Sequence, residues 1–200
     1  MAKLMTNAQI KKAIQGCEQD ELIELILKIA QSCQQAREYL ALNFTENQEE
    51  ILGKYKQKVK DEFFPKRGFG RLNLREAKKA IADYKKICPD RMMVIDIMLF
   101  YVENCVAFTN EYGDINETFY NSAINVYSDV VKEINTIGAI AYERFAARLD
   151  AAAHHACHGW GFYDAMIDLY HEIEFAGGMS SNFDYHAMTQ YSPSRRRNSA

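Results

Sequence analysis

Two histidines in the last third of the chain are the residues whose type and spacing come closest to a metal site. His154 and His158 lie one helical turn apart, so both imidazoles could reach one ion. The segment that follows could supply a third ligand from Asp164, Asp168, His171 or Glu172. However, zinc needs three or four convergent ligands, and the residues between the two histidines do not form the H-E-x-x-H pattern. We therefore favour a helix end, where the dipole attracts histidine, over a metal site.

A basic segment, residues 54–86, could bind phosphates. It carries twelve Lys or Arg against four Asp or Glu, a net charge of +8, whereas residues 1–53 carry −3 and residues 87–200 carry −8. Coulomb attraction and backbone N–H donors could hold nucleic acid there. The candidate ligands are Lys66, Arg67, Arg71, Lys78, Lys79, Lys85 and Lys86. We favour a solvated face that pairs with the acidic C-terminal half, because the alternating lysines of residues 54–60 cannot share one helical face.

Acidic residues around Gly113 form a third candidate, a cleft with general acid or base groups. The carboxylates are those of Glu111, Asp114 and Glu117. Helix capping explains them more simply, because helix N-termini favour acidic side chains. The sequence also contains no P-loop, Rossmann or G-x-S-x-G motif. We therefore expect a protein that is not an enzyme and that uses no cofactor.

The composition indicates a single soluble domain in a reducing compartment. With 200 residues, 48% of them hydrophobic, the chain can bury a core without disulfides or a metal. Its five cysteines include no C-x-x-C pair. The apolar stretch of residues 22–30 is interrupted by Glu24 and Lys28, so it predicts a buried helix rather than a signal peptide. We expect a cytoplasmic protein that binds no membrane.

Apolar periodicity and helix propensity predict an all-α chain without strands. Residues 66–71 are the clearest loop. Residues 1–175 are expected to form one helical domain, and residues 176–200, rich in Ser, Asn and Arg, a flexible tail. The predicted helices cover about 6–15, 19–31, 33–43, 46–63, 73–88, 89–112, 114–135, 139–158 and 161–175.

A repeat is suggested by two strings of the sequence. FYNSAINVY at residues 119–127 and FYDAMIDLY at 162–170 align without a gap, 43 positions apart. The same interval relates Ile81, Ile124 and Ile167, and also Tyr84, Tyr127 and Tyr170. This period is typical of two-helix solenoid repeats. The alternative is that amphipathic helices share such residues by chance.

We therefore expect antiparallel helix pairs stacked as a short HEAT/armadillo-like right-handed solenoid, with roughly three two-helix repeats after N-terminal capping helices. The isoleucines and the tyrosines of the repeat should then occupy equivalent buried positions.

Three stretches resemble a known family: EFFPKRG at residues 62–68, EYGDINETFYNS at 111–122 and GWGFYD at 159–164. They are similar to an uncharacterised bacterial all-helical family labelled only as a domain of unknown function. The resemblance extends from the N-terminal helices to about residue 175. It implies no reaction and assigns no catalytic or binding residues.

The sequence favours a non-enzymatic helical-repeat interaction or scaffold protein, because solenoids present extended binding surfaces. A protein partner is expected rather than nucleic acid. Two alternatives remain open: a metal-dependent enzyme using His154 and His158, and a nucleic-acid-binding module using residues 54–86. The sequence does not indicate an oligomeric state.

Overall fold

The computed structural model describes residues 4–45, 47–157 and 159–176, and its regular structure over these residues is entirely helical. A short 3₁₀ turn, η1 (Gly159–Gly161), precedes the last helix. The helices are α1 (Asn7–Ile14), α2 (Gln19–Ser32), α3 (Gln34–Phe44), α4 (Gln48–Phe63), α5 (Leu74–Ile87), α6 (Arg91–Tyr112), α7 (Glu117–Ile137), α8 (Ala139–His154) and α9 (Phe162–His171). The all-α prediction is confirmed. Residues 177–200, which cover nearly all of the predicted tail, lie outside the described residues.

Local capping residues explain where several helices begin and end. The side chains of Asn73, Asp90 and Asn116 accept hydrogen bonds from backbone N–H groups in the first turns of α5, α6 and α7. Helices α6 and α7 end at Gly113 and Gly138, whose φ angles of 85° and 100° suit glycine best. The short connections then fold consecutive helices back on one another.

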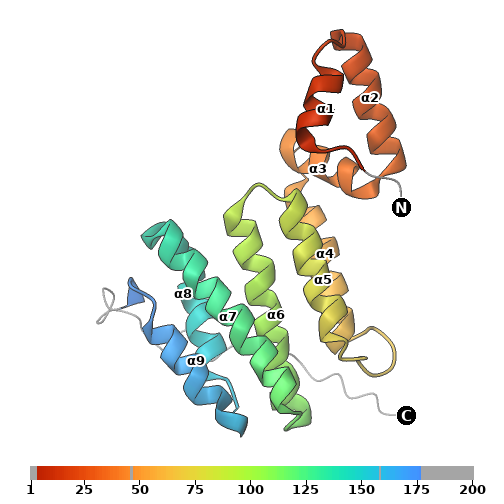
Figure 1. Ribbon diagram of the computed structural model, residues 1–200. Coiled ribbons are helices and arrows are strands. Elements are labelled where there is room, and N and C mark those ends of the chain that lie inside the picture. The colour runs from red at the N-terminus through yellow and green to blue at the C-terminus, as the bar shows by residue number, and fades with distance from the viewer. Residues whose placement is uncertain (1–3, 46, 158, 177–200) are drawn as a thin grey trace.

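Helices α4 to α9 form the body of the protein, arranged as the pairs α4–α5, α6–α7 and α8–α9 (Figure 1). Helix α6 is central, because it packs against α4, α5, α7 and α8. Of the described helices, it alone is long and apolar enough to span a membrane, but 72% of its most apolar window is buried in the bundle. This burial is typical of the core helix of a soluble protein.

The core of the body is rich in tyrosine. Tyr55, Tyr84, Tyr101, Tyr120 and Tyr127 are at most 2% exposed. Each hydroxyl has a partner, so these side chains fill the core without leaving a polar atom unsatisfied. For example, the Tyr101 hydroxyl lies 2.8 Å from the Ser122 hydroxyl. No buried side-chain N or O atom of the described residues lacks a hydrogen-bond partner.

Of the three isoleucines and three tyrosines that the predicted repeat relates, only half are buried. Tyr84 and Tyr127 are fully buried and Ile81 is 7% exposed. In contrast, Ile124, Ile167 and Tyr170 are only partly buried, and they pack at the margin of the core. Helix α9 is the last described helix, and no further helix pair among the described residues packs on it. On α7, Ile124 lies roughly 90° around the helix from the centre of the buried face, and therefore at its edge.

Helices α1 to α3, residues 4–44, form a separate N-terminal module. Figure 1 shows it projecting from one end of the body, with α3 next to the ends of α4 and α5. Helix α2 packs against α3. Within this module only Leu42 is fully buried. The module therefore has almost no core of its own.

Candidate interaction surface

Helix α2 is well specified by its own sequence. Glu18 and Glu21 form a capping box at its start, in which the Glu18 N–H donates to the Glu21 carboxylate at 2.9 Å. Acidic Asp20 lies in the same turn, where the helix dipole favours it. The helix ends at Cys33, whose backbone is extended. Because these signals are local, the predicted bounds of 19–31 agree with the structure to within one residue.

The predicted burial of residues 22–30 is wrong, because α2 contains no buried residue. At 3.6 residues per turn, its apolar side chains cover an arc of roughly 200°, about twice the stripe that a surface helix needs. One neighbour, α3, cannot cover such an arc. The half-exposed side chains are Ile23 (47% exposed), Leu25 (40%), Ile26 (47%), Leu27 (54%) and Ile29 (47%).

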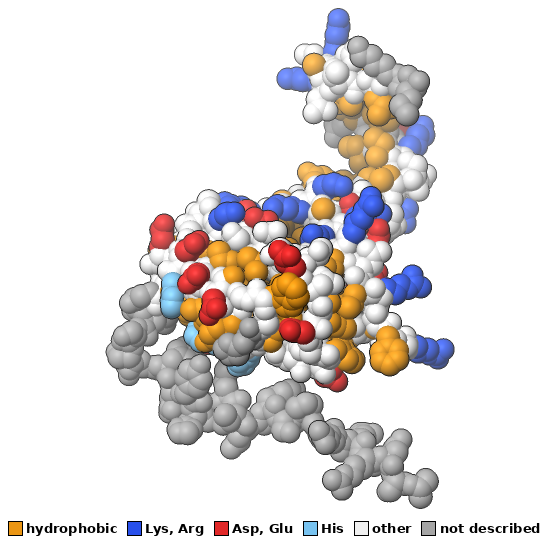
Figure 2. Space-filling view, turned by 60° about the horizontal axis from the view of Figure 1, so that its bottom comes forward, with side chains coloured by type: hydrophobic (Ala, Val, Ile, Leu, Met, Phe, Trp, Pro, Cys, Tyr) orange, Lys and Arg blue, Asp and Glu red, His pale blue; other side chains and the backbone are white. Residues whose placement is uncertain are grey.

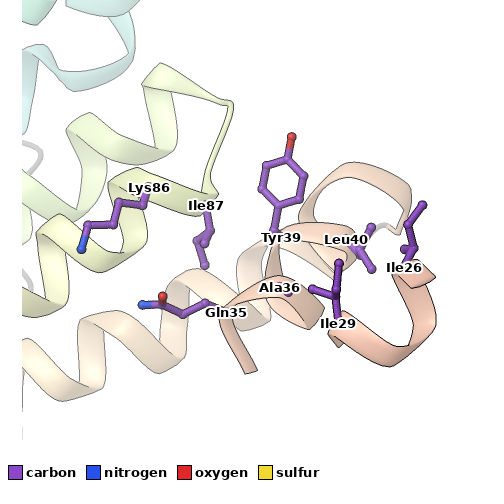
Figure 3. A pocket seen from close by; sticks show the side chains of 8 residues that line it. All are labelled: Ile26, Ile29, Gln35, Ala36, Tyr39, Leu40, Lys86 and Ile87. Atoms are coloured by element: carbon purple, nitrogen blue, oxygen red, sulfur yellow. The ribbon is translucent and has the colours of Figure 1, made fainter. Parts of the chain in front are cut away.

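A groove runs between α2, α3 and the end of α5 (Figure 3), with a volume of about 410 Å³. Ile26 and Ile29 line it from α2, and Tyr39 and Leu40 from α3. Its other lining residues are Gln35, Ala36, Lys86 and Ile87. The lining is thus mostly aliphatic and aromatic, which suits an apolar side chain of a partner better than a charged ligand.

The rest of the module extends this apolar surface. Of the fifteen large hydrophobic side chains that are exposed among the described residues, eleven lie in residues 4–44. Leu4 is 87% exposed before α1, and Phe44 is 81% exposed at the end of α3. Figure 2 shows hydrophobic side chains gathered on this module. Apolar patches of this kind mark binding surfaces in soluble proteins.

Most ion pairs of the basic segment are local. Lys54 pairs with Glu50 at 3.0 Å, and Lys86 pairs with Asp83 at 2.9 Å, each within one helix. Lys79 lies 3.8 Å from Glu76 in the same way. In Figure 2 the basic side chains are interspersed with acidic ones rather than joined in one continuous patch. The preferred interpretation as a solvated face is thus supported, although the partners are mainly local acids and not the C-terminal half.

A groove between α4 and α5 shows the same mixture of charges. It has a volume of about 390 Å³, and four carboxylates line it beside two lysines. The lining residues are Lys58, Asp61, Glu62, Glu76, Lys79, Ala80 and Asp83. Phosphate would be repelled by this lining. The structure therefore does not gather the lysines of α5 into an anion site here; Lys78 and Lys85 are exposed on the same helix.

The other predicted phosphate ligands lie on the α4–α5 loop, residues 64–73. Lys66, Arg67 and Arg71 are exposed and form no ion pair with the described residues. Between them, the ring of Phe69 is 89% exposed. The loop is held against α4, because the Leu72 N–H donates to the Glu62 carbonyl at 2.8 Å.

Of the two histidines predicted as metal ligands, the structure describes His154, whereas His158 lies outside the described residues. His154 is the last residue of α8. Its Nδ1 lies 3.0 Å from the Asp150 carbonyl oxygen and 3.2 Å from the Asp150 carboxylate, and its ring meets Tyr170 edge-on. The described residues contain no group of three His, Cys, Asp or Glu side chains that could hold a metal. The metal site therefore stays a prediction.

The region of Gly113 and Gly159 is closed by internal contacts. The Tyr120 hydroxyl donates to the Asp114 carboxylate at 2.7 Å, and the Cys157 thiol donates to that hydroxyl at 3.5 Å. Burial, together with the bond to Asp114, raises the pKa of Tyr120 well above its usual value. A Cβ atom at Gly159 would overlap the Asp114 carboxylate. The Tyr120 hydroxyl thus links the Asp114 carboxylate to Cys157, and Asp114 is engaged in this contact.

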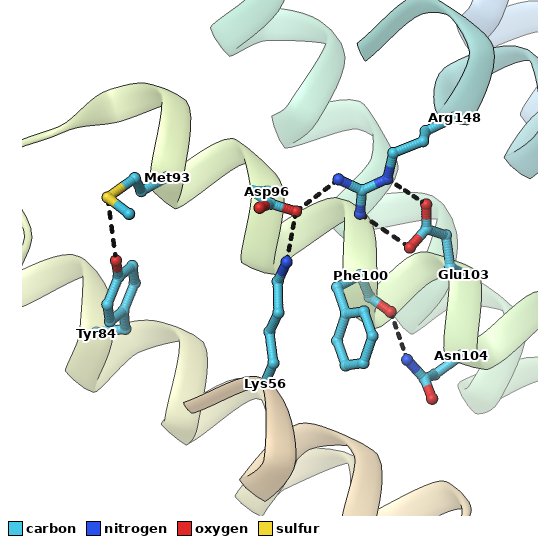
Figure 4. A network of polar contacts seen from close by, with 8 residues as sticks. All are labelled: Lys56, Tyr84, Met93, Asp96, Phe100, Glu103, Asn104 and Arg148. Atoms are coloured by element: carbon cyan, nitrogen blue, oxygen red, sulfur yellow. Dashed lines mark hydrogen bonds and ion pairs between the residues drawn. The ribbon is translucent and has the colours of Figure 1, made fainter. Parts of the chain in front are cut away.

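One polar cluster was not predicted from the sequence (Figure 4). Asp96 of α6 accepts hydrogen bonds from Lys56 of α4 at 2.8 Å and from Arg148 of α8 at 2.5 Å. The Arg148 guanidinium also donates to both oxygens of Glu103, at 2.6 and 2.9 Å. Two cations therefore meet two anions, and this balanced cluster joins three helices. A lone acidic residue inside the apolar run of α6 was the signal in the sequence.

The pKa of Asp96 reflects this setting. Burial alone would raise it, but the hydrogen bonds from Lys56 and Arg148 and their charges outweigh burial and lower the pKa below its ordinary value. The carboxylate is therefore charged at neutral pH, and one of its oxygens accepts from both cations. This arrangement stabilises the packing of α4, α6 and α8.

A comparison with known protein families shows which family the chain belongs to. Residues 5–183 match the model of a family of unknown function, DUF6155. The chain belongs to this family. The match covers the module from its second residue onward and the whole described body, and it agrees with the expected resemblance to a domain of unknown function. No curated protein and no solved structure matches the chain.

Proposed function

We propose that this chain is a non-enzymatic helical-repeat protein that binds a protein partner through the apolar surface of α1 to α3. One observation carries the proposal: α2 is apolar over roughly twice the usual arc, yet contains no buried residue. The body, in contrast, hides most of its large hydrophobic side chains. A helix that is apolar over most of its circumference is normally covered. A partner helix would cover it.

The spacing of helix starts supports the HEAT/armadillo-like part of the proposal. The N-caps Asn47 and Asp90 of α4 and α6 are 43 positions apart, and so are the N-caps Asn73 and Asn116 of α5 and α7. Helices α4 and α6 also pack against each other, as do α6 and α8. Such stacking of first helices is typical of a solenoid, in which a separate module at one end can carry the binding surface. The five described cysteines are unpaired, which supports a cytoplasmic location.

Site-specific photo-crosslinking tests the proposal. A photoreactive phenylalanine analogue replaces Ile26 of α2, which lines the groove and is 47% exposed, and in a matched control it replaces Ile140 of α8, which is 68% exposed. We expect a discrete adduct at position 26 only, identified by mass spectrometry. Binding should be reconstituted from purified components and lost in Ile26→Glu. The same adducts at both positions, or none at position 26, would refute the interaction surface.

A second candidate function, contact with single-stranded nucleic acid, is favoured by the α4–α5 loop alone. Its exposed Phe69 ring stands between the unpaired cations Arg67 and Arg71. Bases stack on such rings while cations hold phosphates, and each stacked base contributes about 1–3 kcal/mol. Fluorescence anisotropy with a labelled oligonucleotide at low salt tests it. Phe69→Ala should weaken binding, and Lys78→Gln with Lys85→Gln on α5 should weaken it less. No binding by the parent chain would remove this candidate.

A further inference from the structure

We infer that the partner of the N-terminal surface is a second copy of this chain, paired through α2 in antiparallel orientation. The inference rests on the proposed function and names its partner. Three independent features support it: the spacing of apolar residues along α2, the positions of its charges, and the missing core of the module.

The first feature is a seam of apolar residues at coiled-coil spacing. Leu22, Leu25 and Ile29 recur at intervals of three and four residues, so they form one narrow stripe along α2. Leu25 is 40% exposed and Ile29 is 47% exposed. Ile26 lies on one flank of this stripe, beside the groove above α3. The seam therefore has the pattern that packs against another helix of the same kind.

The second feature fixes the orientation. Glu21 and Lys28 are one heptad apart and lie on the same flank of the seam, opposite the flank that carries Ile26. In an antiparallel pair, this flank of one helix lies beside the same flank of the other. Glu21 of each copy then comes near Lys28 of its partner, twice by symmetry. A parallel pair would instead place Glu21 beside Ile26 of the partner and leave Lys28 without an acidic neighbour there.

The third feature is the lack of a core in residues 4–44, where only Leu42 is buried. Two α2–α3 hairpins packed face to face would form a four-helix bundle, the usual way for hairpins to gain an interior. The partner's apolar side chains would fill the groove of about 410 Å³ lined by Ile26, Ile29 and Leu40. The module carries four basic and five acidic residues, so two copies have little net charge to repel each other.

Light scattering coupled to size exclusion tests the inference on the full chain at tens of micromolar. We expect twice the chain mass of 23.0 kDa. The double variant Leu25→Glu, Ile29→Glu should be monomeric with unchanged circular dichroism, because both side chains are already half exposed. The matched control Ile140→Glu, on the exposed face of α8, should remain dimeric.

A charge exchange tests the orientation. Glu21→Lys and Lys28→Glu should each weaken the dimer by about tenfold or more, and the double exchange should restore it. Loss of the Glu21 capping box cannot explain such a rescue, since the double variant lacks the box as well. Failure of the rescue would overturn the antiparallel arrangement.

The remaining outcomes separate this inference from the function on which it rests. A dimer that survives Leu25→Glu, Ile29→Glu overturns the inference, because the copies would then pair elsewhere. A monomeric parent chain that still cross-links a different protein at position 26 overturns the second copy and leaves the interaction surface standing. A monomeric parent chain without an adduct at position 26 overturns both.

Discussion

Arg148 of α8 donates a hydrogen bond of 2.5 Å to the carboxylate of Asp96 on α6, across 52 positions of the sequence. The Asp96 side chain is only 13% exposed, whereas that of Arg148 is 33% exposed. Lys56 of α4 reaches the same carboxylate oxygen from the other side. One acidic group on the central helix thus links the first helices of all three pairs, so its removal should weaken the whole body.

Asp96→Asn should destabilise the protein by roughly 1–3 kcal/mol, because the bonds from two cations lose their charged acceptor while Arg148 keeps Glu103. Urea denaturation measures this change. Asp129→Asn is the matched control: its carboxylate lies 3.7 Å from Lys132 on the surface, with 63% of the side chain exposed. The control should change stability by less than about 0.5 kcal/mol. Equal effects in both variants would contradict the role of the cluster.

The pH dependence of stability should reveal the same carboxylate. Because the pKa of Asp96 is lower in the folded protein than in the unfolded chain, its contribution is present above the unfolded value of about 3.9 and is lost as pH falls through the folded pKa. The stability difference between the parent and Asp96→Asn should therefore be constant from about pH 7 to 5 and shrink below about pH 4. A difference that grows in acid would contradict the lowered pKa.

Truncating the isoleucines of the predicted repeat should destabilise the protein more where the side chain is more deeply buried. Ile81→Ala should cost roughly 2–5 kcal/mol, as for other buried aliphatic truncations, because Ile81 is 7% exposed. Ile124→Ala should cost less by at least about 1 kcal/mol, since its side chain is only partly buried. Thermal or urea unfolding of both variants tests the order. Equal losses would show that the two positions are equivalent after all.

The sequence was sufficient where a structural feature depends on near neighbours. The predicted helix of residues 73–88 agrees with α5 to within one residue at each end, because its N-cap Asn73 acts on residues within one turn. The Asp96 cluster could not be predicted in this way. Its partners are 40 and 52 positions away, and only the packing of α4, α6 and α8 brings them together.

On the candidate surface, the sequence predicts the local structure correctly and the burial wrongly. The apolar run of residues 22–30 correctly predicts a helix, but the burial that it also predicts does not occur, because α2 contains no buried residue. A pattern of hydrophobic residues indicates that a helix needs a partner, and it does not specify whether the partner belongs to the same molecule. In this structure Ile26 and Leu27 are 47% and 54% exposed.

Two glycines should respond in opposite directions to alanine. Gly53 lies in the exposed interior of α4, where a Cβ atom would meet nothing within 4 Å. Gly53→Ala should therefore stabilise the protein by about 0.5–1 kcal/mol. A Cβ atom at Gly159 would overlap the Asp114 carboxylate, so Gly159→Ala should destabilise by roughly 1–3 kcal/mol. Melting temperatures of the two variants check the sign of each effect.

The histidines at the end of α8 allow a direct decision between a metal site and a helix end. The His154 Nδ1 atom already lies 3.0 Å from the Asp150 carbonyl oxygen, so only the other ring nitrogen is free to face an ion. We expect the protein, saturated with zinc and then dialysed, to retain no stoichiometric ion by elemental analysis. His154→Ala should then change stability by no more than about 0.3–1 kcal/mol, the range of dipole interactions at a helix C-terminus. One bound ion per chain that is lost in both His154→Ala and His158→Ala would instead establish the metal site, because one remaining histidine holds an ion poorly.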